Sequence, residues 1–265
     1  MNSLQFIDQL HRTVEITFPP QKIISLVPSQ TELLVDLGLE ENIVGITKFC
    51  VHPPHLLKTK PKVGGTKNLR LDKIRSLQPD IIIANKEENS KEQIDELEKY
   101  FPVWISDVKN FEDSLKMITS VGEFTGTSNI ASQIILRIRK EKMQLVAIDP
   151  KHFNTVYLIW KDPWMTVGGD TFIHTMIETA GFENMCKHQM RYPVLSDSQL
   201  TTLNPEVILL SSEPYPFKEK NVKELQELLP GAKVVLVDGE MFSWYGSRMQ
   251  FSFTYFHELK KRVNN

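Results

Sequence analysis

The sequence has few cysteines, no long apolar run and almost no net charge. Cys50 and Cys186 are the only cysteines in 265 residues, so no disulfide framework is defined, and we expect both to be small packed side chains. No stretch approaches the roughly 18 apolar residues that a membrane-spanning helix needs. A net charge of −2 gives no support for general binding to nucleic acid, which needs a clustered excess of Lys and Arg.

Signatures of catalysis and of metal or phosphate binding are also missing. There is no Gly-x-Ser-x-Gly elbow and no paired-carboxylate signature, so we nominate no catalytic residue. The two histidines of His52-Pro53-Pro54-His55 have no Cys or His partner at a zinc-site spacing, which favours a surface turn and no metal site. Gly168–Thr171 lacks the lysine and the spacing of a phosphate loop, so we expect Asp170 to be a helix N-cap. No resident cofactor is predicted.

What the chain does contain is an internal repeat. Leu77-Gln78-Pro79-Asp80 followed by three isoleucines returns 126 residues later as Leu203-Asn204-Pro205-Glu206 followed by Val-Ile-Leu. Gly38-Leu39-Glu40 is echoed in the same order by Gly181-Phe182-Glu183. Ordered echoes predict two similar lobes, and the cleft between two lobes is where small ligands usually bind.

Short apolar, β-branched runs alternate with helical patterns through both halves, which indicates parallel sheets covered by helices. Two capping boxes, Ser29 with Glu32 and Ser196 with Gln199, are expected to open helices. The predicted strands are 22–27, 43–46, 80–84 and 103–105 in the first half, and 155–159, 207–210 and 233–237 in the second. The fold class is therefore α/β, with two Rossmann-like lobes that each contain a parallel sheet.

The two halves are joined by predicted helices at 111–123 and 128–147. In the second helix Ile130, Ile134, Ile135, Ile138, Met143 and Val146 fall approximately on one face. Twenty helical residues span about 30 Å, so this helix is expected to be a rigid connector between the lobes. The predicted division is an N-terminal lobe at 1–110, connecting helices at 111–150 and a C-terminal lobe at 151–265.

Ligands of open parallel sheets bind beyond the carboxyl ends of the strands. Three of the four tryptophans fall in such loops of the second half, and their flat rings suit a large planar ligand, although ordinary packing between the lobes would also explain them. Arg248 is either a partner for a ligand carboxylate or phosphate, or a surface arginine in the first turn of a helix. The residues nominated as ligand contacts are Ser29, Phe49, Thr66, Asn85 and Lys86 in the first lobe, and Trp160, Trp164, Tyr215, Trp244, Tyr245 and Arg248 in the second.

The run Ser-Leu-Val-Pro-Ser-Gln-Thr-Glu-Leu at 25–33, followed by Leu-Gln-Pro-Asp-Ile-Ile-Ile at 77–83, resembles the helical-backbone class of ABC-transporter solute-binding proteins. The similarity extends over nearly the whole chain beyond residue 20, and the cobalamin-binding members are the most similar. This resemblance implies a non-enzymatic monomer that captures a corrinoid, haem or iron-siderophore chelate and delivers it to an ABC permease.

In this class a glutamate on each lobe docks onto arginines of the permease. Glu32 matches the first position, whereas the second falls on Ser198, with Asp197 beside it; Glu32 and Asp197 are therefore the candidate docking residues. The aromatic residue after the second strand is kept as Phe49, but two tryptophans of the corrinoid site are replaced by Thr66 and Asn85.

The resemblance implies a periplasmic or membrane-associated protein. Residues 1–8 have neither a basic nor an apolar signal-peptide region, which leaves a cytoplasmic location or a missing native leader open. The alternative function is therefore a cytoplasmic enzyme or metallocofactor-handling protein on a similar scaffold. A third is an intracellular sensor that reports its ligand to a protein partner.

Overall fold

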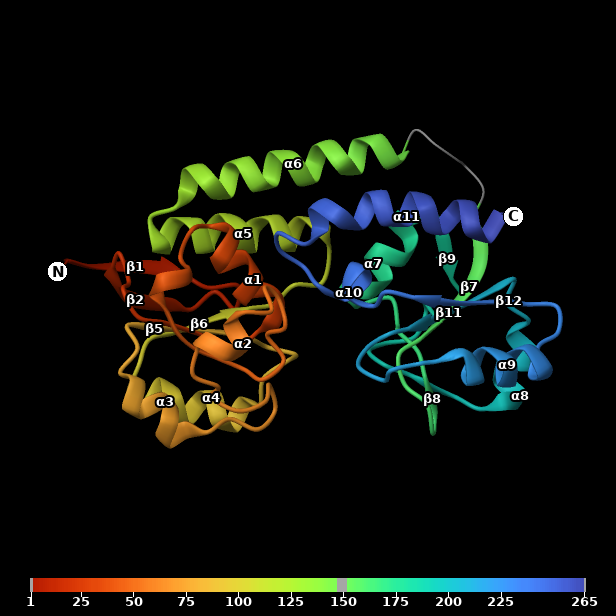
Figure 1. Cartoon of the computed structure of the whole chain (residues 1–265), viewed down its shortest axis with the longest axis horizontal. Coiled ribbons are helices and arrows are strands. Elements are labelled where there is room, and N and C mark those ends of the chain that lie inside the picture. Colours follow the sequence, from red (N-terminus) through yellow and green to blue (C-terminus); the bar gives the residue numbers. More distant parts are fainter. Residues whose placement is uncertain (1, 147–151, 265) are drawn as a thin grey trace. The chain divides into compact units, whose positions relative to one another are not determined.

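The computed structural model describes residues 2–146 and 152–264, and these form two compact units (Figure 1). Unit 1 comprises residues 2–108, 112–138 and 245–248, and unit 2 comprises the other described residues. The predicted boundaries at 110 and 150 stay predictions, and residue 150 lies outside the described residues. No helix among the described residues combines the length and the apolar character needed to cross a membrane.

The sheet of unit 1 has four parallel strands in the order β4-β3-β5-β6. Its apolar strands are buried because helices cover both faces, as is usual for parallel sheets. Ile74 of α3 and Leu97 of α4 pack with Ile24 and Ile82 of the sheet in one buried cluster. The elements up to the connector are β1 (Asn2–Ile7), β2 (Thr13–Phe18), β3 (Ile23–Ser25), α1 (Pro28–Asp36), the 3₁₀ turn η1 (Glu40–Asn42), β4 (Ile43–Ile46), α2 (Leu56–Thr59), α3 (Leu71–Leu77), β5 (Ile81–Asn85), α4 (Lys91–Glu98), β6 (Val103–Ser106), α5 (Phe111–Thr125) and α6 (Ser128–Val146).

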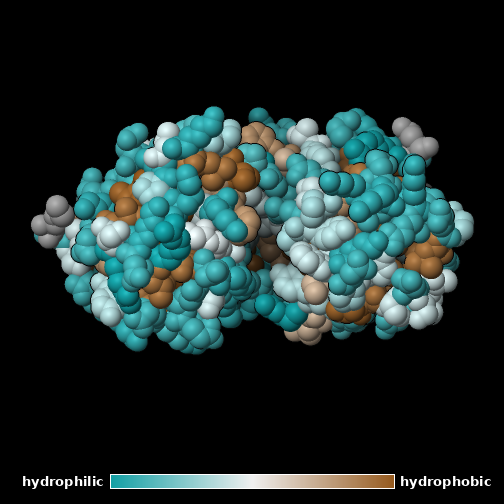
Figure 2. Space-filling view, turned by 60° about the horizontal axis from the view of Figure 1, so that its bottom comes forward, coloured by the Kyte–Doolittle hydropathy of each residue, from teal (hydrophilic) through white to brown (hydrophobic). Residues whose placement is uncertain are grey.

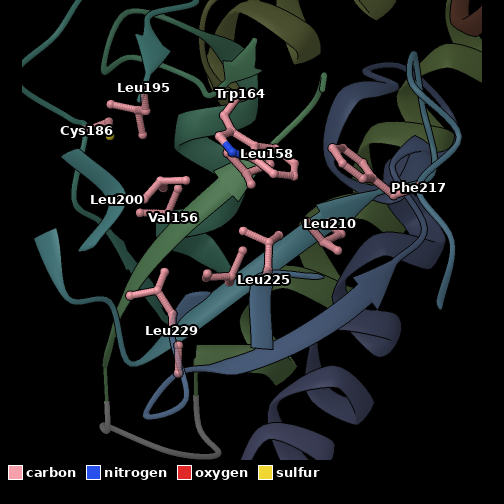
Figure 3. Packing of buried hydrophobic residues seen from close by; sticks show 12 residues of the cluster. Val156, Leu158, Trp164, Cys186, Leu195, Leu200, Leu210, Phe217, Leu225 and Leu229 are labelled. Carbon is pink, nitrogen blue, oxygen red and sulfur yellow. The ribbon is translucent and has the colours of Figure 1, made fainter. Parts of the chain in front are cut away.

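The sheet of unit 2 repeats this plan, with the parallel order β9-β7-β11-β12. Leu200 of α8 and Leu225 of α9 pack on Val156, Ile208 and their neighbours (Figure 3). The remaining elements are β7 (Phe153–Leu158), β8 (Trp164–Met165), α7 (Phe172–Thr179), β9 (Phe182–Asn184), β10 (Val194–Leu195), α8 (Asp197–Leu203), β11 (Val207–Ser211), α9 (Glu219–Leu228), β12 (Lys233–Val237), α10 (Glu240–Ser243) and α11 (Met249–Asn264).

The sequence repeat falls on the same step in both units. Its first copy ends α3 and starts β5, and its second copy ends α8 and starts β11. Gln78 and Asn204, at matching positions, both end their helices in the left-handed conformation, with φ of 48° and 47°. The predicted α/β fold with two parallel sheets is therefore confirmed, and the strand orders show that the two units are built alike.

Local predictions had mixed outcomes. The capping box of Ser196 and Gln199 is confirmed, but the one of Ser29 and Glu32 is wrong. Because proline has a helical φ and no N–H to satisfy, α1 begins at Pro28 and Ser29 lies inside its first turn. The N-cap of α7 is Thr171 and not Asp170, whose carboxylate accepts the backbone N–H of Arg191.

The connector prediction was wrong in one respect. Residues 128–146 do form one continuous helix, but Met143 lies on its solvent side and Ile130 is also exposed, so neither is buried with Ile134 and Ile138. Ala147 of the predicted helix lies outside the described residues. The hairpin of β1 and β2, which is antiparallel, was not predicted.

Both cysteines are free and buried, as expected. His55 lies in a turn, where its imidazole contacts the Glu40 carboxylate, and no cluster of three potential metal ligands occurs within residues 2–146 and 152–264. On the face drawn in Figure 2, the surface is mainly hydrophilic and its apolar patches are separate.

Candidate functional site

The carboxyl ends of β5 and β6 in unit 1 are fixed by buried amides. The Asn85 side chain donates to the carbonyl oxygen and the hydroxyl of Ser106 at 3.2 and 3.0 Å. Its Oδ1 accepts the backbone N–H groups of Glu87 and Glu88. Asn85 is thus buried and shapes the loop after β5, which leaves its side chain little capacity for a ligand.

Phe49 is the exposed aromatic residue at this end of unit 1. It follows β4, and 48% of the residue is accessible to solvent. The Lys48 ammonium lies 4.9 Å from its ring centroid, and a Cβ on Gly65 would come within 3.2 Å of the ring. Phe49 can therefore stack on a ligand from its open side.

The other nominated residues of unit 1 differ in accessibility. Lys86 is half exposed and pairs with Asp107 at 2.8 Å. Thr66 is partly buried, and its carbonyl accepts the Asn89 amide. The Ser29 side chain is buried, with no hydrogen-bond partner among the described residues for its hydroxyl.

Residues Tyr245–Arg248, here called the strap, belong to unit 1 although the chain on both sides of them belongs to unit 2. Tyr245 donates its hydroxyl to Glu88 at 2.9 Å, and the Gly246 N–H donates to Ser114 Oγ at 3.1 Å. Gly246 has a φ of +106°, which side chains rarely tolerate. The strap is therefore built into unit 1 by specific backbone and side-chain contacts.

Arg248 completes the strap through a bidentate ion pair with Glu32. Arg248 Nε and Nη2 donate to the two carboxylate oxygens at 2.8 and 2.6 Å. The two side chains are only 10% and 12% exposed. Burial raises the pKa of the Glu32 carboxyl, while the hydrogen bonds and charge of Arg248 lower it. Arg248 is thus committed to a partner in its own unit and is not a surface arginine.

In unit 2 four aromatic rings follow one another from the surface into the core. Trp160, after β7, is 41% exposed and meets Tyr215 edge to face at 5.6 Å between ring centroids. Tyr215 contacts Phe217 at 4.7 Å, and Phe217 stacks on Trp164 at 6.3 Å. Trp164 and Phe217 belong to the buried core shown in Figure 3. Only Trp160 and, in part, Tyr215 are open to a ligand.

Trp244 is a packing residue anchored by a partly buried carboxylate. Its indole N–H donates to Glu213 Oε1 at 3.0 Å, and the Ser243 hydroxyl donates to the same oxygen. Burial raises the pKa of the Glu213 carboxyl, although both hydrogen bonds act against this. The Trp164 indole is held in the same manner by Asp197, at 2.8 Å.

The nominated residues therefore fall into two groups. Phe49, Lys86, Trp160 and, in part, Thr66 and Tyr215 are accessible at the carboxyl ends of their sheets. Ser29, Asn85, Trp164, Trp244, Tyr245 and Arg248 are buried. The nominated contact residues did not include Glu88, Ser114 and Glu213, which fix the strap and Trp244. Glu88 and Glu213 both lie in loops that follow parallel strands, and this position was the available signal for these two residues.

Comparison with known proteins agrees with this architecture. The chain matches the periplasmic binding protein family over residues 23–230. It is 28% identical over 214 residues to the uncharacterized ABC transporter substrate-binding lipoprotein YvrC of Bacillus subtilis, covering 76% of this chain and 67% of the relative. It is 27% identical over 201 residues to the vitamin B12-binding protein of Vibrio campbellii, covering 73% and 71%.

Solved structures show the same fold. The periplasmic vitamin B12 binding protein BtuF of Vibrio cholerae has a TM-score of 0.79 at 20% identity, covering 94% of this chain and all of that one. The periplasmic heme-binding protein RhuT from Roseiflexus sp. RS-1 has a TM-score of 0.79 at 19% identity, covering 92% and 99%. The family match spans most of the sequence, and the chain belongs to the periplasmic binding protein family.

Proposed function

We propose that this protein binds a large, ring-bearing metal chelate, namely a corrinoid, a haem or an iron-siderophore, and delivers it to an ABC importer. Membership of a family of transport binding proteins supports a non-enzymatic role. The names of the relatives support the ligand class, because several are vitamin B12-binding proteins and similar folds include heme-binding proteins.

The observation that carries the ligand proposal is the exposed ring of Trp160, backed by Tyr215. An exposed tryptophan supported by a second ring offers a stable flat surface, and covering it with a ligand removes apolar area from water. Phe49 offers a second such ring in unit 1. Of the three tryptophans nominated as ligand contacts, only Trp160 remains a candidate, since Trp164 and Trp244 are packed inside unit 2.

Permease docking is proposed to use Asp197 more readily than Glu32. Asp197 is exposed at the start of α8, and the Trp164 indole N–H is bound at one of its carboxylate oxygens, Oδ1. Glu32 is largely buried, and both of its oxygens accept from Arg248. A permease arginine could bind Glu32 only by displacing Arg248, which would leave a buried guanidinium without its partner.

We further propose that the protein acts outside the cytoplasmic membrane, because its relatives are periplasmic proteins or lipoproteins. None of the contacts described above favours the alternatives of a cytoplasmic enzyme or an intracellular sensor.

Calorimetric titration with cyanocobalamin, cobinamide, haemin and a ferric siderophore tests the proposal. We expect saturable binding of at least one chelate, and Trp160→Leu to weaken it up to about tenfold, because leucine keeps part of the apolar contact area and loses the flat ring. Tyr100→Leu, which removes an exposed aromatic residue after α4, is the matched control and should leave affinity unchanged. Absence of saturable binding with all four chelates would refute the proposed ligand class.

A further inference from the structure

The outer side of α6 carries large apolar side chains where a solvated helix normally has polar ones. Ala131, Ile134 and Ile138 mark its buried side. On the opposite side Leu136 is 66% exposed and Met143 is 76% exposed. These two residues are seven positions apart, so they lie on one line along the helix, about 10.5 Å from each other.

The same side of α6 is basic. Lys140 lies between Leu136 and Met143 on the helix surface, and Arg137 and Arg139 flank it. Neither Arg137 nor Lys140 forms an ion pair with any of the described residues. The one acidic residue of the helix, Glu141, accepts a hydrogen bond from Thr254 of α11 and so lies toward that neighbour. The outer face of α6 is defined here as Leu136, Arg137, Arg139, Lys140 and Met143.

We propose that the outer face of α6 binds the surface of an anionic lipid membrane, with the helix axis parallel to the bilayer. Leu136 and Met143 would enter the boundary between headgroups and acyl chains, as the apolar residues of interfacial helices do. Lys140 and Arg137 would extend to the lipid phosphates while their aliphatic stems cover apolar surface.

Charge and shape both favour lipid over a protein partner. A second copy packed on this face about a twofold axis would bring the basic residues of both copies into one interface, and this repulsion between like charges is unfavourable. Leu136 and Met143 stand apart along the helix, with Lys140 between them. A deformable, negatively charged surface can cover such separated residues, whereas a rigid protein surface needs matched pockets.

This surface is independent of the proposed ligand site, so either proposal can fail alone. Vesicle co-sedimentation of the full chain tests it, with phosphatidylcholine vesicles compared to vesicles containing 30% phosphatidylglycerol. We expect binding to the anionic vesicles only, with strong weakening at high salt. Each basic residue near the surface contributes about 1 kcal/mol, so Arg137→Glu with Lys140→Glu should lower the partition coefficient at least 25-fold.

Two matched variants control for charge and for apolar character. Lys220→Glu with Lys223→Glu makes the same change of net charge on the exposed side of α9 and should retain most of the binding. Met143→Gln should weaken binding several-fold, whereas Met190→Gln, at a methionine that is also largely exposed, should not.

Several results would overturn the proposal. They are absence of binding to anionic vesicles, equal losses in the α6 and α9 charge variants, and equal losses in the two methionine variants. Concentration-dependent dimerisation that Met143→Gln abolishes would also overturn it, by assigning the face to a second copy. All five residues are exposed, so circular dichroism should show unchanged folding of each variant.

Discussion

At the scale of single residues, the ion pair of Arg248 and Glu32 is expected to matter for stability because both side chains are almost fully buried. Arg248→Met should lower the free energy of unfolding by about 3 kcal/mol, because it leaves the Glu32 carboxylate buried without its partner. The double variant Glu32→Leu with Arg248→Met should recover most of that loss, since no unpaired charge then remains buried. Urea unfolding of the wild type, both single variants and the double variant measures the coupling.

Additive losses in this cycle would show that the pair contributes nothing specific. Lys86→Met is the control, because it removes a cation from a more exposed pair in the same unit. Such pairs contribute about 0–1 kcal/mol, so this variant should change stability little.

At the scale of elements, the acidic residue of the repeat holds the strand that precedes it in the sheet. Asp80 Oδ2 accepts the N–H groups of Gln21 and Lys22, at 2.7 and 2.8 Å, just before β3. Glu206 Oε2 accepts one N–H, from Asn154 at 2.8 Å, near the start of β7. The repeated sequence therefore encodes a contact between neighbouring strands as well as a turn.

The number of hydrogen bonds that each carboxylate accepts predicts how much stability is lost when that residue is replaced. Asp80→Ala should lower the free energy of unfolding by about 2 kcal/mol and Glu206→Ala by about 1 kcal/mol. Asp80→Asn, which keeps an acceptor oxygen, should lose less than Asp80→Ala. Chemical denaturation monitored by circular dichroism gives the values, and equal costs for the two alanine variants would contradict the explanation.

Helices and strands could be predicted from the sequence wherever residues close together in the chain determine them. The repeat, the alternation of strands and helices, and the capping box at Ser196 all depend on residues close in sequence. The start of α1 was misplaced because Pro28 competes with Ser29 for the first turn, and proline prevailed. The accessibility of Trp160, in contrast to Trp164 and Trp244, could not be predicted, because it depends on partners such as Asp197 and Glu213 that only the folded units bring near.

At the scale of the whole molecule, the two separate hydrophobic cores predict two regions whose local stability can change separately. Ile82 and Ile208 occupy equivalent positions of the repeat, and each is fully buried in the core of its own unit. Replacing either with alanine should cost about 2–5 kcal/mol, and local unfolding should follow the unit that carries the change. Hydrogen exchange with mass spectrometry should show faster exchange of β3 peptides for Ile82→Ala and of β7 peptides for Ile208→Ala.

The strap provides the most specific comparison in this experiment, because it belongs to unit 1 while the chain on both sides of it belongs to unit 2. Peptides covering Tyr245–Arg248 should respond to Ile82→Ala, although their neighbours on both sides in the sequence should respond to Ile208→Ala. A strap that instead follows Ile208→Ala would show that its contacts with Glu32 and Glu88 do not govern its stability.

The strap also determines when unit 1 can be finished during synthesis. A ribosome makes the chain from its N-terminus, so the first sheet is complete once residue 106 has emerged. Glu32, Glu88 and Ser114 must then wait while all the strands of unit 2 are made, because their partners are at 245–248. The unit that begins first is completed only after the strands of unit 2 have been made, and no prefix of the chain that ends before Arg248 encodes a finished first unit.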